Sequence, residues 1–257
     1  MSDNNILVLG ANGMLGKMVS LYLKSNNELN VFVTSRSKNS FIEENSSSNG
    51  AGAYLNGTTS FQNLDILNNN ASNNGGGIYS DGSLSINVSN INANESTNSG
   101  GGLYIEGEYF ADSTNVNFNL AGNHGGGIYG NGTINNTFTE LNDNSSDTDG
   151  GGIWWGSGQV TVERSDIRRN NASRGGGVFI LAENPIFQFD VIALNDATTI
   201  GGGMYIAKSS TASSTPIIFN STVVYNTSAV LGSGLLCTSQ TNPVVQNSIF
   251  WGNLAAD

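Results

Sequence analysis

The sequence predicts an all-β protein: a right-handed parallel β-helix of about eight coils, preceded by a short β-α-β segment. The first observation is a set of glycine clusters of the type GGG[IL]Y. The clusters begin at Gly50, Gly75, Gly100, Gly125, Gly150, Gly175, Gly201 and Gly232. Their spacing is identical from the first cluster to the sixth and then increases at the last two. A regular repeat of this kind indicates coils that stack on one another.

The second observation is an asparagine column in the same register. Each asparagine follows a hydrophobic residue by three positions and shortly precedes the next cluster, where one follows. We expect an amide ladder at a turn, where stacked side chains hydrogen-bond to one another and to the backbone. The column comprises Asn69, Asn94, Asn119, Asn144, Asn170, Asn195, Asn226 and Asn253.

The third observation is alternation with period two between the clusters, as in Leu84, Ile86 and Val88. Such alternation is typical of half-buried strands. A single repeat with two or three short strands cannot bury its own apolar side chains. Equivalent strands are therefore expected to pair in parallel, about 4.8 Å per coil. We place this β-helix at residues 51–257.

Two adjacent columns follow each glycine corner, and they point to opposite sides of a strand. We expect the aliphatic column to face the interior and the aromatic column to form a stacked strip outside. The aliphatic column is Ile78, Leu103, Ile128, Ile153, Val178, Met204 and Leu235. The aromatic column is Tyr54, Tyr79, Tyr104, Tyr129, Trp154, Phe179 and Tyr205.

These corners, together with S-x-I-x-x-N strands and the terminal PVVQNSIFWGN, resemble the repeats of polymorphic outer-membrane proteins. The resemblance covers about four-fifths of the chain. It implies a cell-surface or extracellular location, and a class that includes adhesins, passenger stalks and polysaccharide-cleaving enzymes. The N-terminus lacks the basic region of a signal peptide, so a cytoplasmic location stays open.

Residues 1–40 follow a different pattern. NILVLG predicts a buried strand, GANGMLG a glycine turn, MLGKMVSLYLKSN a helix and NVFVTSR a second strand. Residues 41–50 form the expected seam between this segment and the β-helix. The segment acts either as a cap on the open end of the β-helix or as a fragment at a fusion junction.

The N-terminal segment resembles the start of extended short-chain dehydrogenases of the dTDP-4-dehydrorhamnose reductase type. The resemblance implies that Gly10, Gly13 and Gly16 approach a cofactor pyrophosphate, and that Arg36 favours NADP. It stops near Ser40, and the Tyr-x-x-x-Lys pair of that family is missing. We therefore expect no cofactor, and NADP only if this segment is functional.

Composition narrows the classes of partner. The net charge of −11 and the pI near 4.3 argue against nucleic acid, because binding phosphates needs clustered lysine and arginine. No apolar run is long enough for a transmembrane segment. With one histidine and one cysteine, a zinc site is excluded. The chain is expected to end on an unpaired sheet edge, which predicts end-to-end self-association.

Few residues are candidates for catalysis or metal binding. His124 precedes a corner in a slot that varies between coils, so we interpret it as a solvated turn position. Asp143, Asp147 and Asp149 fail the pattern of a calcium loop and are interpreted as a solvated acidic turn. We identify no complete catalytic constellation and no metal site, and we expect a protein that is not an enzyme.

The best candidate ligand face combines aromatic and guanidinium groups in one repeat, which could hold a sugar or an acidic glycan. The alternative is a charge-balanced outer face that includes Glu163 and Asp166. The residues of this candidate face are Trp154, Trp155, Arg164, Arg168 and Arg169.

Three functions follow as hypotheses. The first is a non-catalytic structural or adhesive module that binds a glycan or a protein partner through its regular faces. The second is a polysaccharide-cleaving β-helix, which needs converging carboxylates. The third is a fragment of an NADP-dependent sugar-nucleotide reductase.

Overall fold

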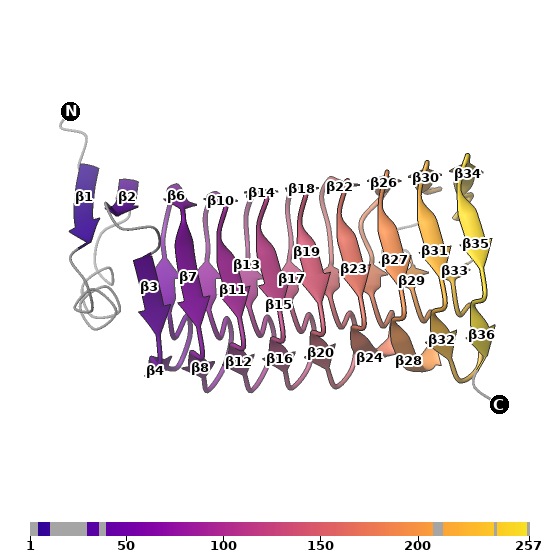
Figure 1. Ribbon diagram of the computed structural model, residues 1–257, viewed down its shortest axis with the longest axis horizontal. Helices are drawn as coiled ribbons and strands as arrows, with labels where there is room; N and C mark the ends of the chain where they lie inside the picture. Colours follow the sequence, from indigo (N-terminus) through magenta and orange to yellow (C-terminus); the bar gives the residue numbers. More distant parts are fainter. Residues whose placement is uncertain (1–4, 11–29, 36–39, 208–212, 239–240, 256–257) are drawn as a thin grey trace.

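The computed structural model describes residues 5–10, 30–35, 40–207, 213–238 and 241–255. These residues form a parallel β-solenoid with eight complete coils stacked along one axis (Figure 1). The prediction of an all-β protein built from stacked coils is confirmed. No helix in the described ranges is long and apolar enough to cross a lipid bilayer.

Each coil contributes one short strand to each of four parallel sheets, called A to D here. Sheet A contains β1 (Asn5–Gly10), β2 (Asn30–Ser35), β6 (Thr59–Gln62), β10 (Leu84–Asn87), β14 (Tyr109–Asp112), β18 (Ile134–Thr137), β22 (Val160–Glu163), β26 (Ile186–Gln188), β30 (Ile217–Phe219) and β34 (Val244–Gln246). Sheet B contains β3 (Ser40–Glu43), β7 (Leu64–Leu67), β11 (Asn90–Asn92), β15 (Asn115–Asn117), β19 (Glu140–Asn142), β23 (Asp166–Arg168), β27 (Val191–Ala193), β31 (Thr222–Val224) and β35 (Ile249–Trp251).

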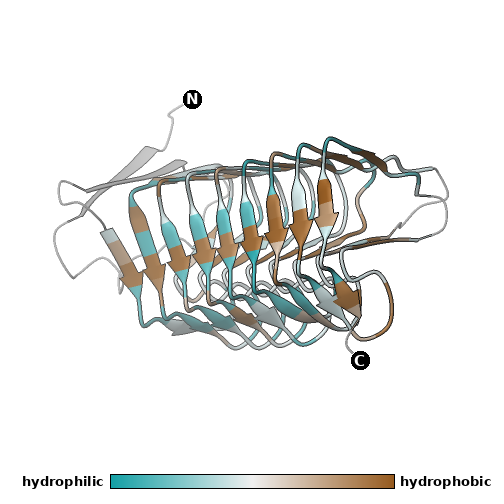
Figure 2. Cartoon of the chain, turned by 45° about the vertical axis from the view of Figure 1, so that its right-hand side comes forward, coloured by the Kyte–Doolittle hydropathy of each residue, from teal (hydrophilic) through white to brown (hydrophobic). Residues whose placement is uncertain are grey.

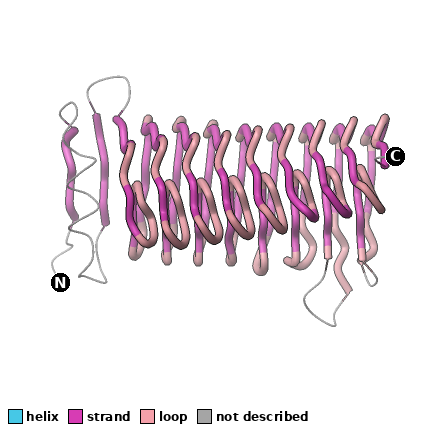
Figure 3. Tube along the Cα trace, turned by 90° about the horizontal axis from the view of Figure 1, so that it is seen from below, coloured by secondary structure: helices cyan, strands magenta, loops and turns pink. Residues whose placement is uncertain are grey.

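The other two sheets complete the coil. Sheet C contains β4 (Ser46–Ser47), β8 (Asn70–Ala71), β12 (Glu95–Ser96), β16 (Leu120–Ala121), β20 (Ser145–Ser146), β24 (Asn171–Arg174), β28 (Asp196–Ile200), β32 (Thr227–Ser228) and β36 (Leu254–Ala255). Sheet D contains β5 (Ala53–Leu55), β9 (Ile78–Ser80), β13 (Leu103–Ile105), β17 (Ile128–Gly130), β21 (Ile153–Trp155), β25 (Val178–Ile180), β29 (Met204–Ile206) and β33 (Leu235–Cys237). The chain follows the order D, A, B, C in every coil. The tube in Figure 3 shows the successive coils stacked on one another.

The constant repeat length sets the register between coils. Ile91 pairs with Val116, which occupies the same position in the next repeat, so like side chains fall into columns. The longer repeats keep this register by a register shift between β24 and β28 and by a longer connection. In the longest repeat, β29 ends at Ile206 and β30 begins at Ile217, and Ile186 still pairs with Ile217.

Inward-facing columns fill the solenoid with apolar side chains. The aliphatic column on sheet D is buried from Ile78 to Met204, as expected, and the larger Phe61, Tyr109, Trp155 and Phe187 fill wider parts of the interior. Each fully buried aliphatic or aromatic side chain contributes about 1.5–3 kcal/mol relative to an exposed one. Because each coil covers its neighbour, the core is continuous along the axis.

The glycine clusters form the corner between sheets C and D. Gly125 has φ +64°, and a Cβ there would lie 2.5 Å from the Ile128 carbonyl oxygen. At Gly127 a Cβ would lie 2.7 Å from the Gly152 carbonyl oxygen of the next coil. Positive φ and close packing between coils therefore account for the repeated glycines.

Two further corners turn through left-handed backbone, and among the described residues they use glycine only at Gly252. The corner between sheets A and B is made by Asn63, Val88, Ser113, Phe138, Arg164, Phe189, Asn220 and Asn247, with φ between +47° and +61°. The corner between sheets B and C is made by Glu44, Asn68, Ala93, Phe118, Asp143, Arg169, Leu194 and Tyr225, with φ between +52° and +60°. Val88, which the alternation placed on a half-buried strand, is instead an exposed residue at the A–B corner.

The two N-terminal strands pair in parallel, and β2 also pairs with β6. The helix expected between them lies outside the described residues. Two short strands fall within residues 40–47, where β3 pairs with β7 and β4 pairs with β8. Stacking on sheets B and C is therefore present before Ala51.

Candidate functional site

The asparagine column is a continuous hydrogen-bonded ladder inside the corner between sheets B and C. Asn94 donates from its backbone N–H and from Nδ2 to Asn119 Oδ1, each over 3.0 Å, and Nδ2 also donates to the Ile66 carbonyl. The same pattern links every neighbouring pair from Asn69 to Asn253. These amides are used within the fold, so they are not available to a ligand.

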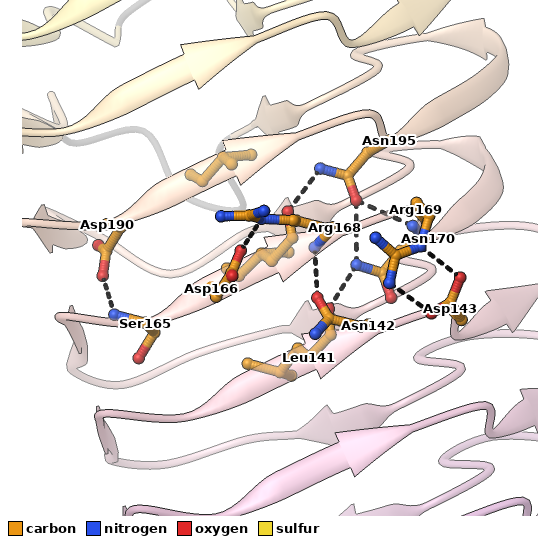
Figure 4. Close-up of polar contacts among 12 residues, drawn as sticks. Leu141, Asn142, Asp143, Ser165, Asp166, Arg168, Arg169, Asn170, Asp190 and Asn195 are labelled. Carbon is orange, nitrogen blue, oxygen red and sulfur yellow. Dashed lines mark hydrogen bonds and ion pairs between the residues drawn. The ribbon is translucent and has the colours of Figure 1, made fainter.

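A second ladder follows the A–B corner, and the sequence alone did not reveal it. Here a side-chain oxygen of one coil accepts a backbone N–H of the preceding coil, as Ser165 Oγ does from Thr139 and Ser221 Oγ from Asp190. Asp190 occupies one position of this column, and its Oδ1 accepts the Ser165 N–H over 2.8 Å (Figure 4). Its Oδ2 is buried without a partner among the described residues. Burial raises the pKa of Asp190 to about 8.

The aromatic column forms a stacked strip on the outside of sheet D from Tyr54 to Trp154, whereas Phe179 is buried and Tyr205 meets it edge-on. Ring centroids from Tyr54 to Trp154 are 4.4–4.9 Å apart, and the ring planes lie within 11° of parallel. Burial within the strip raises the pKa of Tyr79 to about 12. Because each inner ring of this strip is covered on both faces by its neighbours, the strip offers ring edges rather than ring faces. The inner rings therefore lack the open aromatic faces on which a sugar could stack.

Asp149 is not the solvated turn residue that the sequence suggested, whereas the His124 side chain is partly exposed. Asp149 is only 2% exposed and lies between His124 and Arg174, on neighbouring coils. His124 Nδ1 is 3.3 Å from Asp149 Oδ2, and Arg174 donates to both carboxylate oxygens over 2.6 and 2.8 Å. Burial opposes ionisation of Asp149, but the hydrogen bonds from His124 and Arg174 hold its pKa below the usual value.

The three acidic residues of that turn also do not converge. Asp143 pairs with Arg169 at the B–C corner, Asp147 is exposed, and Asp149 is buried. Among the residues that the structure describes, no group of three histidine, cysteine or acidic side chains could hold a metal ion.

The arginines of the candidate ligand face are all paired with carboxylates. Arg169 donates to both oxygens of Asp143 over 2.8 Å each, and Arg168 contacts Asp166 (Figure 4). Arg164 contacts Glu163, and its guanidinium carbon lies 5.6 and 4.9 Å from the ring centroids of Phe138 and Phe189. The surface around these arginines is therefore balanced in charge.

The two tryptophans do not join these arginines. Trp155 is fully buried, and its Nε1 donates to the Gly132 carbonyl over 3.0 Å, so it does not belong to any outer face. Trp154 belongs to the aromatic strip on sheet D, whereas Arg168 lies on sheet B. Two adjacent tryptophans on a strand must point to opposite sides, and the alternation of Ile153, Trp154 and Trp155 contains that signal.

The outward surface of sheet B is the most promising surface for binding. We define the sheet B face as the outward residues of β7, β11, β15, β19 and β23. They form two rows along the axis: Asp65, Asn90, Asn115, Glu140 and Asp166 in the first, and Leu67, Asn92, Asn117, Asn142 and Arg168 in the second. In Figure 2 the strands β11 to β23 of this sheet carry alternating hydrophilic and hydrophobic bands, whereas β27, β31 and β35 are mainly hydrophobic.

Hydrogen bonds leave a row of amide donors on this face. Asn92 Oδ1 accepts the backbone N–H of Asn117, Asn117 Oδ1 accepts that of Asn142, and Asn142 Oδ1 accepts that of Arg168, over 2.8–3.0 Å. The Nδ2 groups of these three asparagines donate to no residue in the described part of the chain, and the side chains are half-buried at the surface. Each therefore offers two N–H donors to a ligand.

Exposed aromatic rings border the face on both sides. Phe118 projects from the B–C corner and is 62% exposed, and Phe138 projects from the A–B corner and is 54% exposed. Left-handed backbone places both residues outside the strands. The Arg164 guanidinium of the next coil lies over the Phe138 ring, whereas the Phe118 ring makes no ring or cation contact with any described residue. This surface was missed because phenylalanine does not signal a left-handed corner in a sequence.

The residues proposed to bind a cofactor are not brought into a described site. Gly10 is the last residue of β1, and Gly13, Gly16 and Arg36 lie outside the described residues. No family model, curated protein or solved structure matches this chain.

Proposed function

We propose that the protein is a non-catalytic binding module that holds an uncharged glycan chain along its sheet B face. The observation that carries this proposal is the row of unpaired amide donors between two exposed phenylalanines. Amide N–H groups match the hydroxyl and ring oxygens of a sugar, and an open aromatic ring packs against its C–H groups. The rows repeat about every 4.8 Å along the axis, so an extended polymer can make the same contact on successive coils.

Charge supports an uncharged ligand. The chain carries a net charge of −11, and the arginines beside the face are already paired with Asp143 and Asp166. Glu140 adds an exposed carboxylate to the first row. An acidic polysaccharide would be repelled by this surface, whereas a neutral one would not. We place this activity at a cell surface or outside the cell, where such polymers are encountered.

Binding to immobilised neutral and acidic polysaccharides tests the proposal. We expect saturable binding to a neutral polymer that changes little with added salt. Phe118→Ala should weaken it by about fivefold or more, because the open ring contributes about 1 kcal/mol or more. Phe110→Ala is the matched control, since Phe110 is in the same coil and 38% exposed but projects from sheet A. Equal affinity of both variants and the wild type would reject this face as the site.

Polysaccharide cleavage is the second candidate, and one observation favours it. Glu140 and Asp166 occupy paired positions on β19 and β23, on the same face. Adjacent coils lie about 4.8 Å apart, close to the separation of about 5 Å between the two carboxylates of retaining glycosidases. We expect no turnover, because Asp166 is held by Arg168. New reducing ends that disappear in Glu140→Gln would instead establish an enzyme.

NADP binding by the N-terminal segment is a separate proposal that rests on the sequence resemblance alone. Titration of NADPH fluorescence against the wild type and Gly13→Trp measures it directly. Identical curves at saturating cofactor would end this proposal without affecting the glycan site.

A further inference from the structure

Four Asn–Gly pairs lie in the described part of the chain, in different structural settings. They are Asn49–Gly50, Asn56–Gly57, Asn74–Gly75 and Asn131–Gly132. An Asn–Gly pair can modify itself when the glycine nitrogen attacks the asparagine side chain, since glycine has no side chain to obstruct the approach. The reaction requires that the glycine N–H is free to leave its hydrogen bond.

In three of the pairs the glycine N–H is held by the next coil. Gly50 donates to the Asn74 carbonyl over 2.9 Å, and Gly75 donates to the Ser99 carbonyl over 3.0 Å. Gly132 donates to the Ser157 carbonyl over 3.0 Å. Each of these bonds belongs to the stacking between coils, so breaking it requires a local separation of two coils.

Gly57 differs from these three glycines. Its N–H makes no hydrogen bond to any described residue, and it lies in the turn between β5 and β6 with φ +92°. The Asn56 side chain is half-buried beside Asp81, where its Nδ2 can donate to both carboxylate oxygens over 2.6 and 3.0 Å. The Gly57 nitrogen that would attack is therefore not held by any described residue, while the Asn56 side-chain nitrogen that would leave lies beside Asp81.

We propose that Asn56–Gly57 is a site of spontaneous deamidation in the folded protein. The Gly57 nitrogen forms a bond to Asn56 Cγ and loses its proton through solvent. The Cγ–Nδ2 bond breaks, and the nitrogen leaves as ammonia, which leaves a five-membered succinimide. Water then opens the ring at either carbonyl and gives aspartate or isoaspartate at position 56.

The product alters the surface of the first coils. Position 56 precedes Asp81 and Glu106 in one column at the turn after sheet D, since β5, β9 and β13 pair in register. A carboxylate at position 56 loses the hydrogen bonds to Asp81 and places like charges on adjacent coils. An isoaspartate also lengthens the backbone of a tight turn.

Peptide mapping by mass spectrometry after incubation of the full chain at mildly alkaline pH tests this inference. In the folded protein we expect conversion at Asn56 to be at least about fivefold faster than at Asn49, Asn74 or Asn131, because one hydrogen bond between coils protects each of those sites by about 1 kcal/mol or more. In denaturant, the four sites should convert at similar rates. Asn56→Ser should remove the fast phase and leave the slow ones unchanged.

Two results would overturn the inference. One is conversion at Asn56 that is no faster than at the other three pairs in the folded protein. The other is a difference between sites that persists in denaturant, which would assign it to the neighbouring sequence rather than to the free Gly57 N–H. Both results leave the sheet B proposal unaffected, because Asn56 does not lie on that face.

Discussion

Asparagine has opposite roles at two positions of the fourth coil. Asn144 belongs to the ladder, where its Oδ1 and Nδ2 are both hydrogen-bonded to neighbouring coils. Asn136 faces the interior of sheet A, is fully buried, and has no partner for either amide atom among the described residues. The same side chain is therefore expected to stabilise the fold at one position and to destabilise it at the other.

Removal of the Asn144 amide should be strongly destabilising. Asn144→Ala leaves the backbone N–H of Asn119 and the Val116 carbonyl without their side-chain partners. We expect the free energy of unfolding to fall by about 2–4 kcal/mol, measured by urea denaturation. Asn135→Ala, at an exposed position of the same coil, is the control and should change it by less than about 0.5 kcal/mol. Similar effects of the two variants would mean that the ladder does not support the stack.

Replacement of Asn136 by valine should stabilise the protein. Its neighbours in the same inward column are Ala111 and Val162, so an apolar side chain of this size fits the column. Because the amide is desolvated without a hydrogen bond, we expect Asn136→Val to raise the free energy of unfolding by about 1–3 kcal/mol. A lower melting temperature than the wild type would show that the amide has a partner within the core.

Asp190 should make stability depend on pH. Its pKa is raised to about 8 in the folded protein from 3.8 in the unfolded chain. The folded state therefore keeps a proton that the unfolded state has lost, and stability falls as pH rises from about 4 to about 8. Asp190→Ser restores the hydroxyl of the column. The free energy of unfolding of this variant, relative to that of the wild type, should therefore increase as the pH rises through this window and stay constant above it.

Urea denaturation of both proteins at several pH values measures this difference. Each unit of raised pKa corresponds to about 1.4 kcal/mol. Asp147→Ser removes an exposed carboxyl shortly before the next glycine corner and is the control for the loss of one carboxyl group. A stability difference between Asp190→Ser and the wild type that does not change with pH would mean that Asp190 is ionised in the folded protein.

At the scale of single elements, some corners of the solenoid could be located from the sequence and others could not. The glycine corners and the asparagine ladder recur with the same residue type in every coil, so periodicity alone located them. The A–B corner carries valine, serine, phenylalanine, arginine and asparagine in turn, and a column of mixed residues gives no periodic signal. Its geometry is imposed by the stacking of coils on either side rather than by local preference.

The His124, Asp149 and Arg174 column was misread for a related reason. Variation between coils suggested a solvated position, but residues at equivalent positions of neighbouring coils are contact partners in a solenoid. A histidine, an aspartate and an arginine in succession at one position form a charge-complementary series. The sheet B face was likewise hidden, because its borders are the left-handed corners that the sequence does not mark.

The left-handed corners predict a simple stabilising substitution. Val88 has φ +47°, which is costly for a β-branched side chain, whereas Asn63 and Asn220 occupy the same corner with little strain. We expect Val88→Asn to raise the free energy of unfolding by about 1 kcal/mol, as measured by urea denaturation. Val191→Asn, on strand β27, should not raise the free energy of unfolding. Destabilisation by Val88→Asn would show that the exposed valine makes a contact that outweighs its strain.

At the scale of the whole molecule, the solenoid is stabilised by contacts between neighbouring coils. Each central coil is covered on two sides, and its inward residues, such as Leu141, are fully buried. In the last described coil, the equivalent Phe250 is 38% exposed. Stability in such a stack is approximately a sum of coil and interface terms, so a coil with one interface opens more easily than a coil with two.

Hydrogen exchange should therefore reveal a gradient along the axis. We expect the backbone amides of β17 to β20, in the fourth coil, to exchange more slowly than those of β33 to β36 by about tenfold or more, because opening the fourth coil breaks two interfaces. Asn144→Ala should accelerate exchange in the coils beside it and leave β33 to β36 nearly unchanged. Uniform protection along the chain would contradict this view, since it would mean that the coils open together as one cooperative unit rather than through interactions between nearest neighbours.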